Sequence, residues 1–318
     1  MLVPNLPANL QLVRSMLQEY YGKYLKSASD LSQKACCTGE TQRRYSEILE
    51  LIPAEVKEKH YGCGCPIPDD DLTGLLVLDL GSGAGVDSFI LSFLTGPEGK
   101  VHGIDMTEEQ LAIASSNVSH VSKRFGYTKP NVFFYKDFIE TASEISDGSI
   151  DLVVSDCVVN LSPRKDLVFK TIYRVLKEGG EFYISDIVAD RRVPKIIQND
   201  PELIAECLGG AEYEHDYLDF IKDAGFLDPR IVKKQEVQRD VANEPIVFYS
   251  ITVRGFKFSE ALDRRCEDYG QIAIYNRQPC KGMSRFYFDD HHIFEANKPT
   301  PVCRNTARML QETRLSKY

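Results

Sequence analysis

From about residue 72 to residue 256, short apolar segments alternate with segments whose apolar residues recur at helical spacing. The first apolar segment, residues 75–80, is almost continuously hydrophobic, which is typical of a strand covered on both faces by helices. Further strands are expected over 100–106, 131–138, 150–159, 181–188, 230–237 and 246–256, and helices over 86–95, 108–125 and 166–176. This alternation predicts an α/β fold with a mostly parallel, doubly wound sheet.

The 318 residues exceed one small domain, so smaller additions are expected on both sides of the sheet. Residues 1–70 are predicted to form a helical and loop segment, with helices over 8–26 and 42–60. Residues 71–256 form the predicted sheet domain. Residues 257–318, with short aromatic strands and a helical tail, are predicted to form a small α+β domain.

A glycine-rich loop follows the first predicted strand and opens a helix, in the sequence Asp79-Leu80-Gly81-Ser82-Gly83. Glycine is needed there because a side chain would keep the backbone away from a ligand. The loop lacks the dinucleotide spacing, since Val86 stands where a third glycine belongs. Asp79 would also repel a pyrophosphate, whereas it suits the cationic methionine end of S-adenosylmethionine (AdoMet).

An acidic residue, Asp105, ends the second predicted strand, where it can accept both ribose hydroxyl hydrogens. With this residue the loop resembles that of class I AdoMet-dependent methyltransferases, and a purely structural glycine turn is the disfavoured alternative. AdoMet is therefore the predicted cofactor. Its predicted contacts are Tyr61, Asp79, Gly81, Ser82, Gly83, Asp105, Met106, Ile139 and Glu140.

Nine cysteines are many for a chain whose N-terminus does not resemble a secretory signal, and reduced thiols are the expectation. Cys157 ends the fourth predicted strand, Cys207 follows the fifth, and Cys63 lies in a Gly/Pro-rich loop before the first. Because α/β sheets bind ligands at the carboxyl ends of their strands, these sulfurs are expected to converge beside the cofactor. Three thiolates there would hold a thiophilic centre.

The chain resembles the arsenite methyltransferases over most of residues 15–255. The resemblance rests on these motifs, in chain order: Tyr20-Tyr21-Gly22, Ala35-Cys36-Cys37, Tyr61-Gly62-Cys63-Gly64, Asp79-Leu80-Gly81-Ser82-Gly83, Gly103-Ile104-Asp105-Met106, Ser155-Asp156-Cys157-Val158-Val159-Asn160-Leu161 and Glu206-Cys207-Leu208-Gly209-Gly210-Ala211.

This resemblance implies a function in which four cysteines are catalytic. Cys63, Cys157 and Cys207 would bind trivalent arsenic, supplied as arsenite or its thiol conjugates. Cys36 would form a disulfide with Cys63 and return methylated pentavalent arsenic to the trivalent state. Thioredoxin or glutathione would then reduce the enzyme again.

Two departures from the family pattern affect the predicted site. Asp156 stands where the resemblance leads us to expect Asn, and a carboxylate beside a thiol raises the thiol's pKa unless the carboxylate points away. Cys37 and Cys65 lie next to matched cysteines, and either could replace its neighbour.

Several residues have simpler interpretations. Cys266, Cys280 and Cys303 are expected to fill the core as small hydrophobic side chains. Cys63 and Cys65 could form half of a zinc site, but no matching pair is present at the usual spacing. His291 and His292 are expected in a solvated turn.

Two other functions stay open. One is a methyltransferase acting on carbon, nitrogen or oxygen of a small metabolite, which needs a general base, and His215 is the one candidate for it. The other is a thiol-rich metalloid-binding or redox protein without catalysis.

The formal net charge of -9 and the lack of a basic patch argue against a nucleic-acid partner. No apolar run approaches the roughly 20 residues that span a bilayer. A cytoplasmic monomer without a membrane partner is therefore expected.

Overall fold

The computed structural model describes residues 6–25, 27, 30–31, 39–260, 262–263, 265–276 and 284–318. The helices are α1 (Leu6–Glu19), η1 (Tyr20–Tyr24), α2 (Glu40–Arg44), α3 (Ser46–Leu49), α4 (Ala54–Lys57), α5 (Val86–Thr95), α6 (Glu108–Arg124), η4 (Val159–Leu161), α7 (Lys165–Val175), α8 (Lys195–Gln198), α9 (Pro201–Ala205), α10 (Glu214–Asp223), η5 (Val241–Asn243), α11 (Arg304–Gln311) and η6 (Arg314–Lys317). The strands are β1 (Leu76–Leu80), β2 (Lys100–Asp105), β3 (Val132–Lys136), β4 (Ile150–Asp156), β5 (Leu176–Ala189), β6 (Glu212–Tyr213), β7 (Arg230–Arg239), β8 (Val247–Phe256), β9 (Ile272–Ile274), β10 (Arg285–Tyr287), β11 (Ile293–Glu295) and β12 (Pro299–Pro301).

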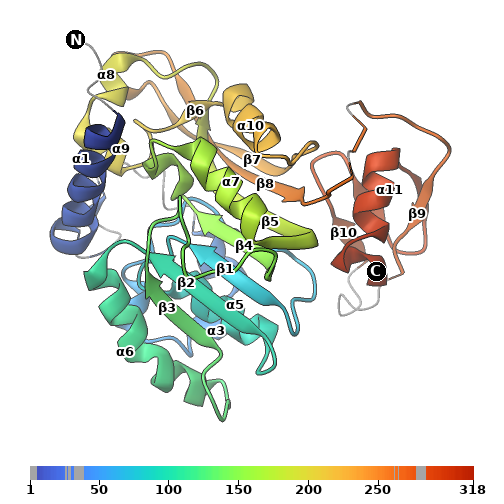
Figure 1. Ribbon diagram of the computed structural model, residues 1–318, viewed down its shortest axis with the longest axis horizontal. Coiled ribbons are helices and arrows are strands. Elements are labelled where there is room, and N and C mark those ends of the chain that lie inside the picture. The colour runs from blue at the N-terminus through green and yellow to red at the C-terminus, as the bar shows by residue number, and fades with distance from the viewer. Residues whose placement is uncertain are drawn as a thin grey trace.

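The centre of the molecule is one sheet in the order β3-β2-β1-β4-β5-β8-β7, with β6 paired to β5 (Figure 1). Strands β1 to β5 run parallel to one another, whereas β8 runs antiparallel between β5 and β7. The predicted α/β class with a mostly parallel, doubly wound sheet is confirmed. All five parallel strands therefore end at one edge, where such sheets bind ligands.

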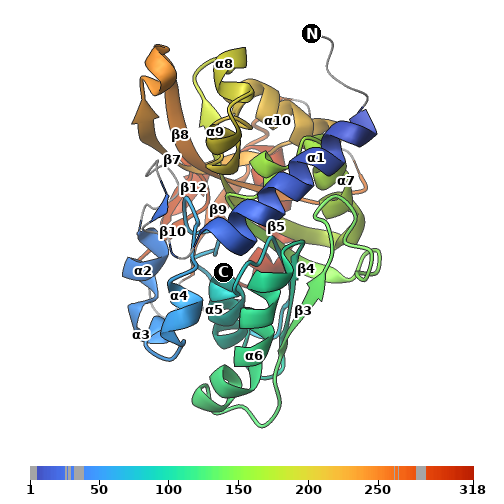
Figure 2. The ribbon, with the colours of Figure 1, turned by 90° about the vertical axis from the view of Figure 1, so that its left-hand side faces the viewer.

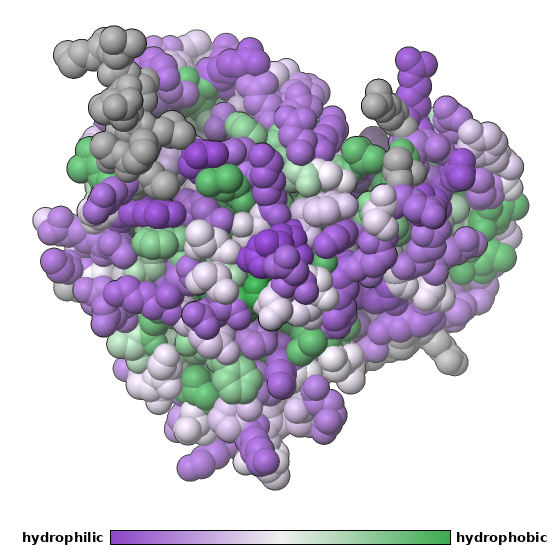
Figure 3. Space-filling view, viewed as in Figure 1, coloured by the Kyte–Doolittle hydropathy of each residue, from purple (hydrophilic) through white to green (hydrophobic). Residues whose placement is uncertain are grey.

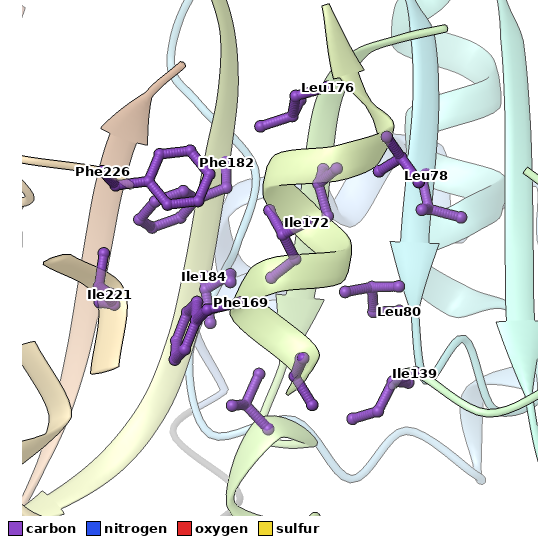
Figure 4. Packing of buried hydrophobic residues seen from close by; sticks show 14 of the residues in the cluster. Leu78, Leu80, Ile139, Phe169, Ile172, Leu176, Phe182, Ile184, Ile221 and Phe226 are labelled. Carbon is purple, nitrogen blue, oxygen red and sulfur yellow. The ribbon is translucent and has the colours of Figure 1, made fainter. Parts of the chain in front are cut away.

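Helices cover both faces of this sheet, which explains why β1 is apolar at almost every position. Leu78 and Leu80 pack in the cluster that contains Phe169 and Ile172 of α7, as Figure 4 shows. Val77, on the opposite face of β1, packs in a second cluster with residues of α5, α3 and α4. Burial of each such side chain contributes about 1.5–3 kcal/mol to the stability of the fold.

The prediction of one helix over 42–60 was wrong, because α2, α3 and α4 are separate short helices. Tyr45 leaves the helical conformation between the first two (φ -119°, ψ 29°). Pro53 is extended (ψ 149°) and directly precedes α4. The helix predicted over 8–26 is present as α1 and the π-helix η1. Figure 2 shows α1 crossing in front of the sheet, above α6.

The C-terminal residues form a small aromatic core beyond β5 and β8, at the side of the sheet in Figure 1. Two antiparallel pairs, β10–β11 and β9–β12, surround this core together with α11. A buried charge network joins it to the sheet. Glu181 of β5 accepts from Arg254 Nε at 2.7 Å and from Arg314 Nε at 3.1 Å. Arg314 also pairs with Asp70.

The view in Figure 3 shows a mainly hydrophilic surface, in which hydrophobic residues form small separate groups. Within the described residues, no helix has both the length and the hydrophobicity that crossing a membrane requires.

Candidate active site

A cavity lies at the carboxyl ends of the central strands and holds about 1030 Å³ of empty space, counted to its open mouth. All nine residues predicted to contact AdoMet belong to its lining: Tyr61, Asp79, Gly81, Ser82, Gly83, Asp105, Met106, Ile139 and Glu140. Cys157 lines the same cavity. The structure thus brings the predicted cofactor contacts and one predicted arsenic ligand into one space.

The glycine-rich loop is held against β2 by its own main chain. Gly81 and Ser82 donate N–H bonds to the carbonyl of Ile104, at 2.8 and 3.0 Å. Gly81 has φ 74°, and a Cβ there would lie 2.5 Å from the Val158 side chain, so this position requires glycine. The loop backbone can therefore approach a ligand closely.

Asp105 accepts hydrogen bonds from the loop and from the start of α6. Its two oxygens accept from Gly83 N at 2.9 Å and Thr107 N at 2.7 Å. Burial raises the pKa of this carboxyl, although these hydrogen bonds oppose the change. Each oxygen keeps a further lone pair, so the carboxylate can still accept ribose hydroxyl groups. Thr107 stands at the N-cap of α6 without a side-chain capping bond.

Three carboxyl groups, those of Asp79, Asp87 and Asp156, line the cavity near His60. His60 Nε2 lies 3.2 Å from Asp87 Oδ2 and 3.8 Å from Asp156 Oδ2. Burial lowers the pKa of His60, but the carboxylates of Asp87, Asp156 and Asp79 outweigh it and raise the pKa to about 9. Burial, together with Asp87, raises the pKa of Asp79 to about 7. His60 is therefore an imidazolium at neutral pH.

Sequence reasoning missed His60 and named His215 as the one candidate base. His215 is exposed and packs against the Tyr213 ring outside the cavity lining. The available signal for His60 was its position directly before Tyr61. Because His60 is already protonated, it cannot take a proton from an acceptor at neutral pH.

The three predicted arsenic ligands lie in one buried cluster. The sulfurs of Cys63 and Cys157 and one carboxylate oxygen of Asp186 lie within 4.8 Å of one another. The Cys207 thiol donates to the carbonyl of Cys157 at 3.0 Å and is not part of that closer group. Cys36 and Cys37 lie outside the described residues.

Cys157 and Cys207 both have left-handed backbones, with φ 60° and 66°. Each such conformation costs a residue other than glycine about 1–3 kcal/mol, and it persists only where the surroundings fix it. Cys157 N donates to Ser185 O at 2.8 Å, and Cys207 N donates to Ile204 O at 3.1 Å. Strained residues of this kind concentrate at ligand sites.

Asp156, the residue that departs from the family pattern, binds the loop that carries Cys63. Its Oδ1 accepts from Cys63 N at 3.0 Å and from Gly64 N at 3.1 Å. A Cβ on Gly62 would lie 1.8 Å from Asp156 Oδ2, so the loop passes directly over the carboxylate. The carboxylate is thus directed toward this main chain and toward His60.

Cys65 faces a different part of the core from Cys63. Cys65 belongs to the hydrophobic cluster that contains Val77, and its sulfur accepts from Arg44 Nη1 at 3.7 Å. Burial raises the pKa of Cys65 to about 12. In this structure Cys65 cannot substitute for Cys63 at the thiol cluster.

Helices α1 and η1 lie along the cavity and connect its two ends. Arg14 pairs with Glu140 at 2.9 Å, and Gln18 donates to the Met106 carbonyl at 2.8 Å. At the other end, Tyr20 donates to Glu206 at 3.1 Å and Tyr21 donates to the Ala205 carbonyl at 2.6 Å. One helical segment therefore contacts both the cofactor residues and the segment that precedes Cys207.

Two further residues beside the thiols were not predicted from the sequence. Asp186 is fully buried and accepts the N–H of Asn160 at 2.9 Å. Burial, followed by Asp186, Cys63 and Cys157, raises the pKa of the Tyr217 phenol well above its usual value. The position of Asp186 near the end of the fifth strand was a usable signal, whereas Tyr217 lies on a helix and gave none.

Comparisons with known proteins agree with this geometry. A family model described as a methyltransferase domain matches residues 72–225. An arsenite methyltransferase from Aquipseudomonas alcaligenes is 42% identical over 95% of this chain and 88% of that protein. The human arsenite methyltransferase is 35% identical over 96% of this chain and 82% of that protein.

A solved structure shares the fold over most of its length. It is an arsenic(III) S-adenosylmethionine methyltransferase from Chlamydomonas reinhardtii, with a TM-score of 0.80 and 42% identity, and the match covers 85% of this chain and 92% of that one. These relatives match most of the chain, and the cavity described above contains the residues expected for AdoMet. The chain therefore belongs to the family of AdoMet-dependent arsenite methyltransferases.

Proposed function

We propose that this chain transfers methyl groups from AdoMet to trivalent arsenic bound by Cys63, Cys157 and Cys207. The observation that carries the proposal is the convergence of the Cys63 and Cys157 sulfurs with Asp186 within 4.8 Å, beside a cavity that Cys157 also lines. Cys207 joins them when its side chain turns from the Cys157 carbonyl toward the other two sulfurs.

Capture of the substrate needs three thiols and no cofactor. Arsenite, As(OH)₃, exchanges its three hydroxyl groups for three cysteine sulfurs, and three water molecules leave with the thiol protons. The product is a pyramidal arsenic centre that keeps a lone pair. Soft thiolates suit this thiophilic element, and the buried apolar surroundings of the cluster exclude competing water.

AdoMet supplies the methyl group as a sulfonium cation, whose carbon accepts the arsenic lone pair. The chain's own contribution is orientation, because the strained Cys157 and Cys207 hold arsenic at a fixed place beside the cavity. No proton leaves arsenic, so no general base is required. A carbon, nitrogen or oxygen acceptor would need one, and the cationic His60 does not provide it.

Methylation oxidises arsenic from the trivalent to the pentavalent state, so turnover requires two electrons. We assign these to Cys36 and the arsenic-bound Cys63: the Cys36 thiol would attack the Cys63 sulfur, form a disulfide and release one proton. The bond between arsenic and the Cys63 sulfur would break, and its electron pair would stay on arsenic, which returns to the trivalent state. Thioredoxin or glutathione would then return two electrons through thiol–disulfide exchange. The enzyme is proposed to act as a cytoplasmic monomer on arsenite or its thiol conjugates.

The test is product analysis with the full chain, arsenite, AdoMet and thiol, followed by chromatography with arsenic-specific detection. We expect Cys157→Ser and Cys207→Ser to lose methylation by about 100-fold or more, because the centre is no longer positioned. Cys36→Ser should complete a first transfer but fail to turn over.

Cys65→Ser is the matched control, since this buried thiol lies in another cluster, and it should keep wild-type activity. Calorimetry with S-adenosylhomocysteine checks that each variant keeps its cofactor site. Normal multiple turnover by Cys157→Ser would refute the arsenic assignment.

A further inference from the structure

A carboxylate stands among the thiols of the proposed arsenic site, and arsenite capture does not require it. One oxygen of Asp186 and the sulfurs of Cys63 and Cys157 lie within 4.8 Å of one another. Trivalent arsenic bonds to three sulfurs and keeps a lone pair, and Cys207 supplies the third sulfur. Asp186 is thus a fourth ligand group that the arsenic chemistry leaves unused.

Main-chain N–H groups fix the position of the Asp186 carboxylate, which is fully buried. Its Oδ1 accepts from Ile187 N at 2.8 Å, and its Oδ2 accepts from Asn160 N at 2.9 Å. Each oxygen of a carboxylate has two lone pairs, so one remains on either side after these bonds. The group can therefore coordinate a cation without losing either contact.

The spacing of the three ligand atoms fits an ion of the zinc type. Proteins bind Zn²⁺ tetrahedrally, with bonds of about 2.3 Å to sulfur and about 2.1 Å to carboxylate oxygen. Neighbouring ligand atoms of such a tetrahedron lie roughly 3.6–3.8 Å apart. The atoms of Cys63, Cys157 and Asp186 would therefore need to approach one another by only about 1 Å, which side-chain rotation can supply.

The Tyr217 hydroxyl is a second, independent sign of a ligand at this place. It is buried and makes no hydrogen bond within the described part of the chain. Burial, followed by Asp186, Cys63 and Cys157, raises the pKa of this phenol. An O–H group that is buried without an acceptor is costly. Around protein metal sites, such donors bond to the ligand atoms and orient them.

We propose that Cys63, Cys157, Cys207 and Asp186 also form a tetrahedral site for a thiophilic divalent cation, Zn²⁺ above all, which competes with arsenite for the three sulfurs. Cys207 completes the tetrahedron when its thiol turns from the Cys157 carbonyl. The three thiols lose their protons to water as the ion binds, and no electrons are transferred. Zinc uses Asp186 and arsenic does not, so this residue distinguishes the two ligands.

The inference concerns the same cysteines as the proposed function, but it requires neither methyl transfer nor cofactor. Loss of methylation with metal binding intact would therefore count against the proposed function alone. Metal binding that fails while methylation proceeds would count against this inference alone.

The test titrates the reduced, purified full chain with Co²⁺, in the absence of AdoMet. Co²⁺ adopts the geometry of Zn²⁺ and gives an ultraviolet charge-transfer band when thiolates bind it. We expect one thiolate-bound Co²⁺ per chain, which either Zn²⁺ or arsenite displaces. The group formed by His60, Asp87 and Asp156 contains no sulfur and cannot give this band. A chain without the band, or a band that persists in excess arsenite, would overturn the proposal.

Asp186→Asn keeps the size of the side chain and one acceptor oxygen. Changes beyond the ligands themselves typically cost 10- to 100-fold in metal affinity, so loss of a ligand should weaken Co²⁺ binding by at least about 100-fold. Arsenite binding, followed by tyrosine fluorescence, should stay within a few-fold of the wild type. Cys157→Ser should lose both ligands. Unaltered Co²⁺ affinity in Asp186→Asn would show that the carboxylate is not a ligand.

Two cysteine variants serve as matched controls and should bind both Co²⁺ and arsenite like the wild type. Cys65→Ser changes a thiol in another cluster. Cys266→Ser changes an exposed thiol, since the expectation that Cys266 fills the core was wrong.

X-ray absorption at the zinc edge of the wild type decides the ligand set even if Asp186→Asn fails to fold. Three sulfurs and one oxygen around zinc would support the proposal. Four sulfurs, or a shell without sulfur, would overturn it.

Discussion

One oxygen of Asp156 accepts the main-chain N–H groups of both Cys63 and Gly64. Because Asp156 directly precedes Cys157, this contact sets the spacing between two of the proposed arsenic ligands. Ser250 Oγ holds the opposite side of the loop by donating to the Cys63 carbonyl at 2.8 Å. The residue that departs from the family pattern thus positions the loop without binding arsenic itself.

Two replacements of Asp156 distinguish the role of its acceptor oxygen from the role of its negative charge. Asp156→Asn keeps an acceptor oxygen for the two N–H groups and should bind arsenite within a few-fold of the wild type. Asp156→Ala leaves the two main-chain N–H groups without their acceptor oxygen. We expect this to reduce the free energy of arsenite binding by about 1.5–3 kcal/mol, which weakens binding by about 10- to 100-fold. Arsenite titration of tyrosine fluorescence measures both, with circular dichroism as the check on folding. Equal affinity in Asp156→Ala and the wild type would show that the loop does not need this contact.

His60 should make stability depend on pH. Its folded-state pKa of about 9 lies above the ordinary value of about 6.5. Its contribution is therefore fully present below pH 6.5 and is lost as the pH rises through 9. We expect His60→Gln to be less stable by up to about 3 kcal/mol at pH 6, with little difference near pH 10. Urea unfolding at both pH values tests this, and a pH-independent difference would contradict it.

At the scale of elements, α1 acts as one wall of the cofactor cavity. The Arg14 guanidinium lies 3.6 Å from the centre of the Phe138 ring and pairs with Glu140, whose side chain is 5% exposed. A nearly buried carboxylate that loses its partner is costly, and the cost should appear as weaker cofactor binding.

We expect Arg14→Met, which keeps the hydrophobic length of the side chain, to weaken S-adenosylhomocysteine binding by about 5- to 30-fold, or 1–2 kcal/mol. Calorimetry measures the change. Arg124→Met removes an exposed arginine that donates to the Glu50 carbonyl and does not belong to the cavity lining, so it should leave binding unaltered. The same loss in both variants would remove the role assigned to α1.

Elements with a single, uninterrupted period were predictable from the sequence. The helix expected over 86–95 is α5, and the one over 108–125 is α6 within one residue. The strand expected over 181–188 is longer, since β5 starts at Leu176 directly after α7. Neighbouring strands supply hydrogen bonds there, and Gly179 with its positive φ is accommodated inside the strand.

The candidate site was predictable to the extent that it follows from strand ends. Cys157 and Asp105 could be placed because parallel strands share one carboxyl edge. His60 could not, because its charge depends on Asp87 and Asp156, which come close only in the folded chain.

At the scale of the whole molecule, Glu181 joins the sheet to the C-terminal core. It is fully buried between Arg254 and Arg314. Arg314 also pairs with the buried Asp70, so removing Arg314 leaves Asp70 without its cation and Glu181 with Arg254 alone. A buried charge without its partner costs about 3–5 kcal/mol. We therefore expect Arg314→Met to lower the thermal midpoint clearly, as measured by calorimetry.

The matched control is Lys298→Met, which removes an exposed ion pair with Glu295. Such pairs contribute about 0–1 kcal/mol, so this variant should unfold close to the wild type. If Arg314→Met also unfolded with the wild type, the ion pairs of Arg314 would not be what holds the two parts of the chain together.

The acidic wall of the cavity has a consequence for the catalytic cycle. Asp79, Asp87, Asp105 and Asp156 line the cavity together with the cationic His60, which they outnumber. The donor carries a sulfonium charge, whereas the thioether left after transfer has none. Each turnover therefore discharges the ligand by one unit inside a field that favours cations. The spent nucleoside loses attraction at the moment when it must depart, and fresh donor regains it. Added salt should change the ratio of donor affinity to product affinity only slightly, because the carboxylates are shielded from solvent.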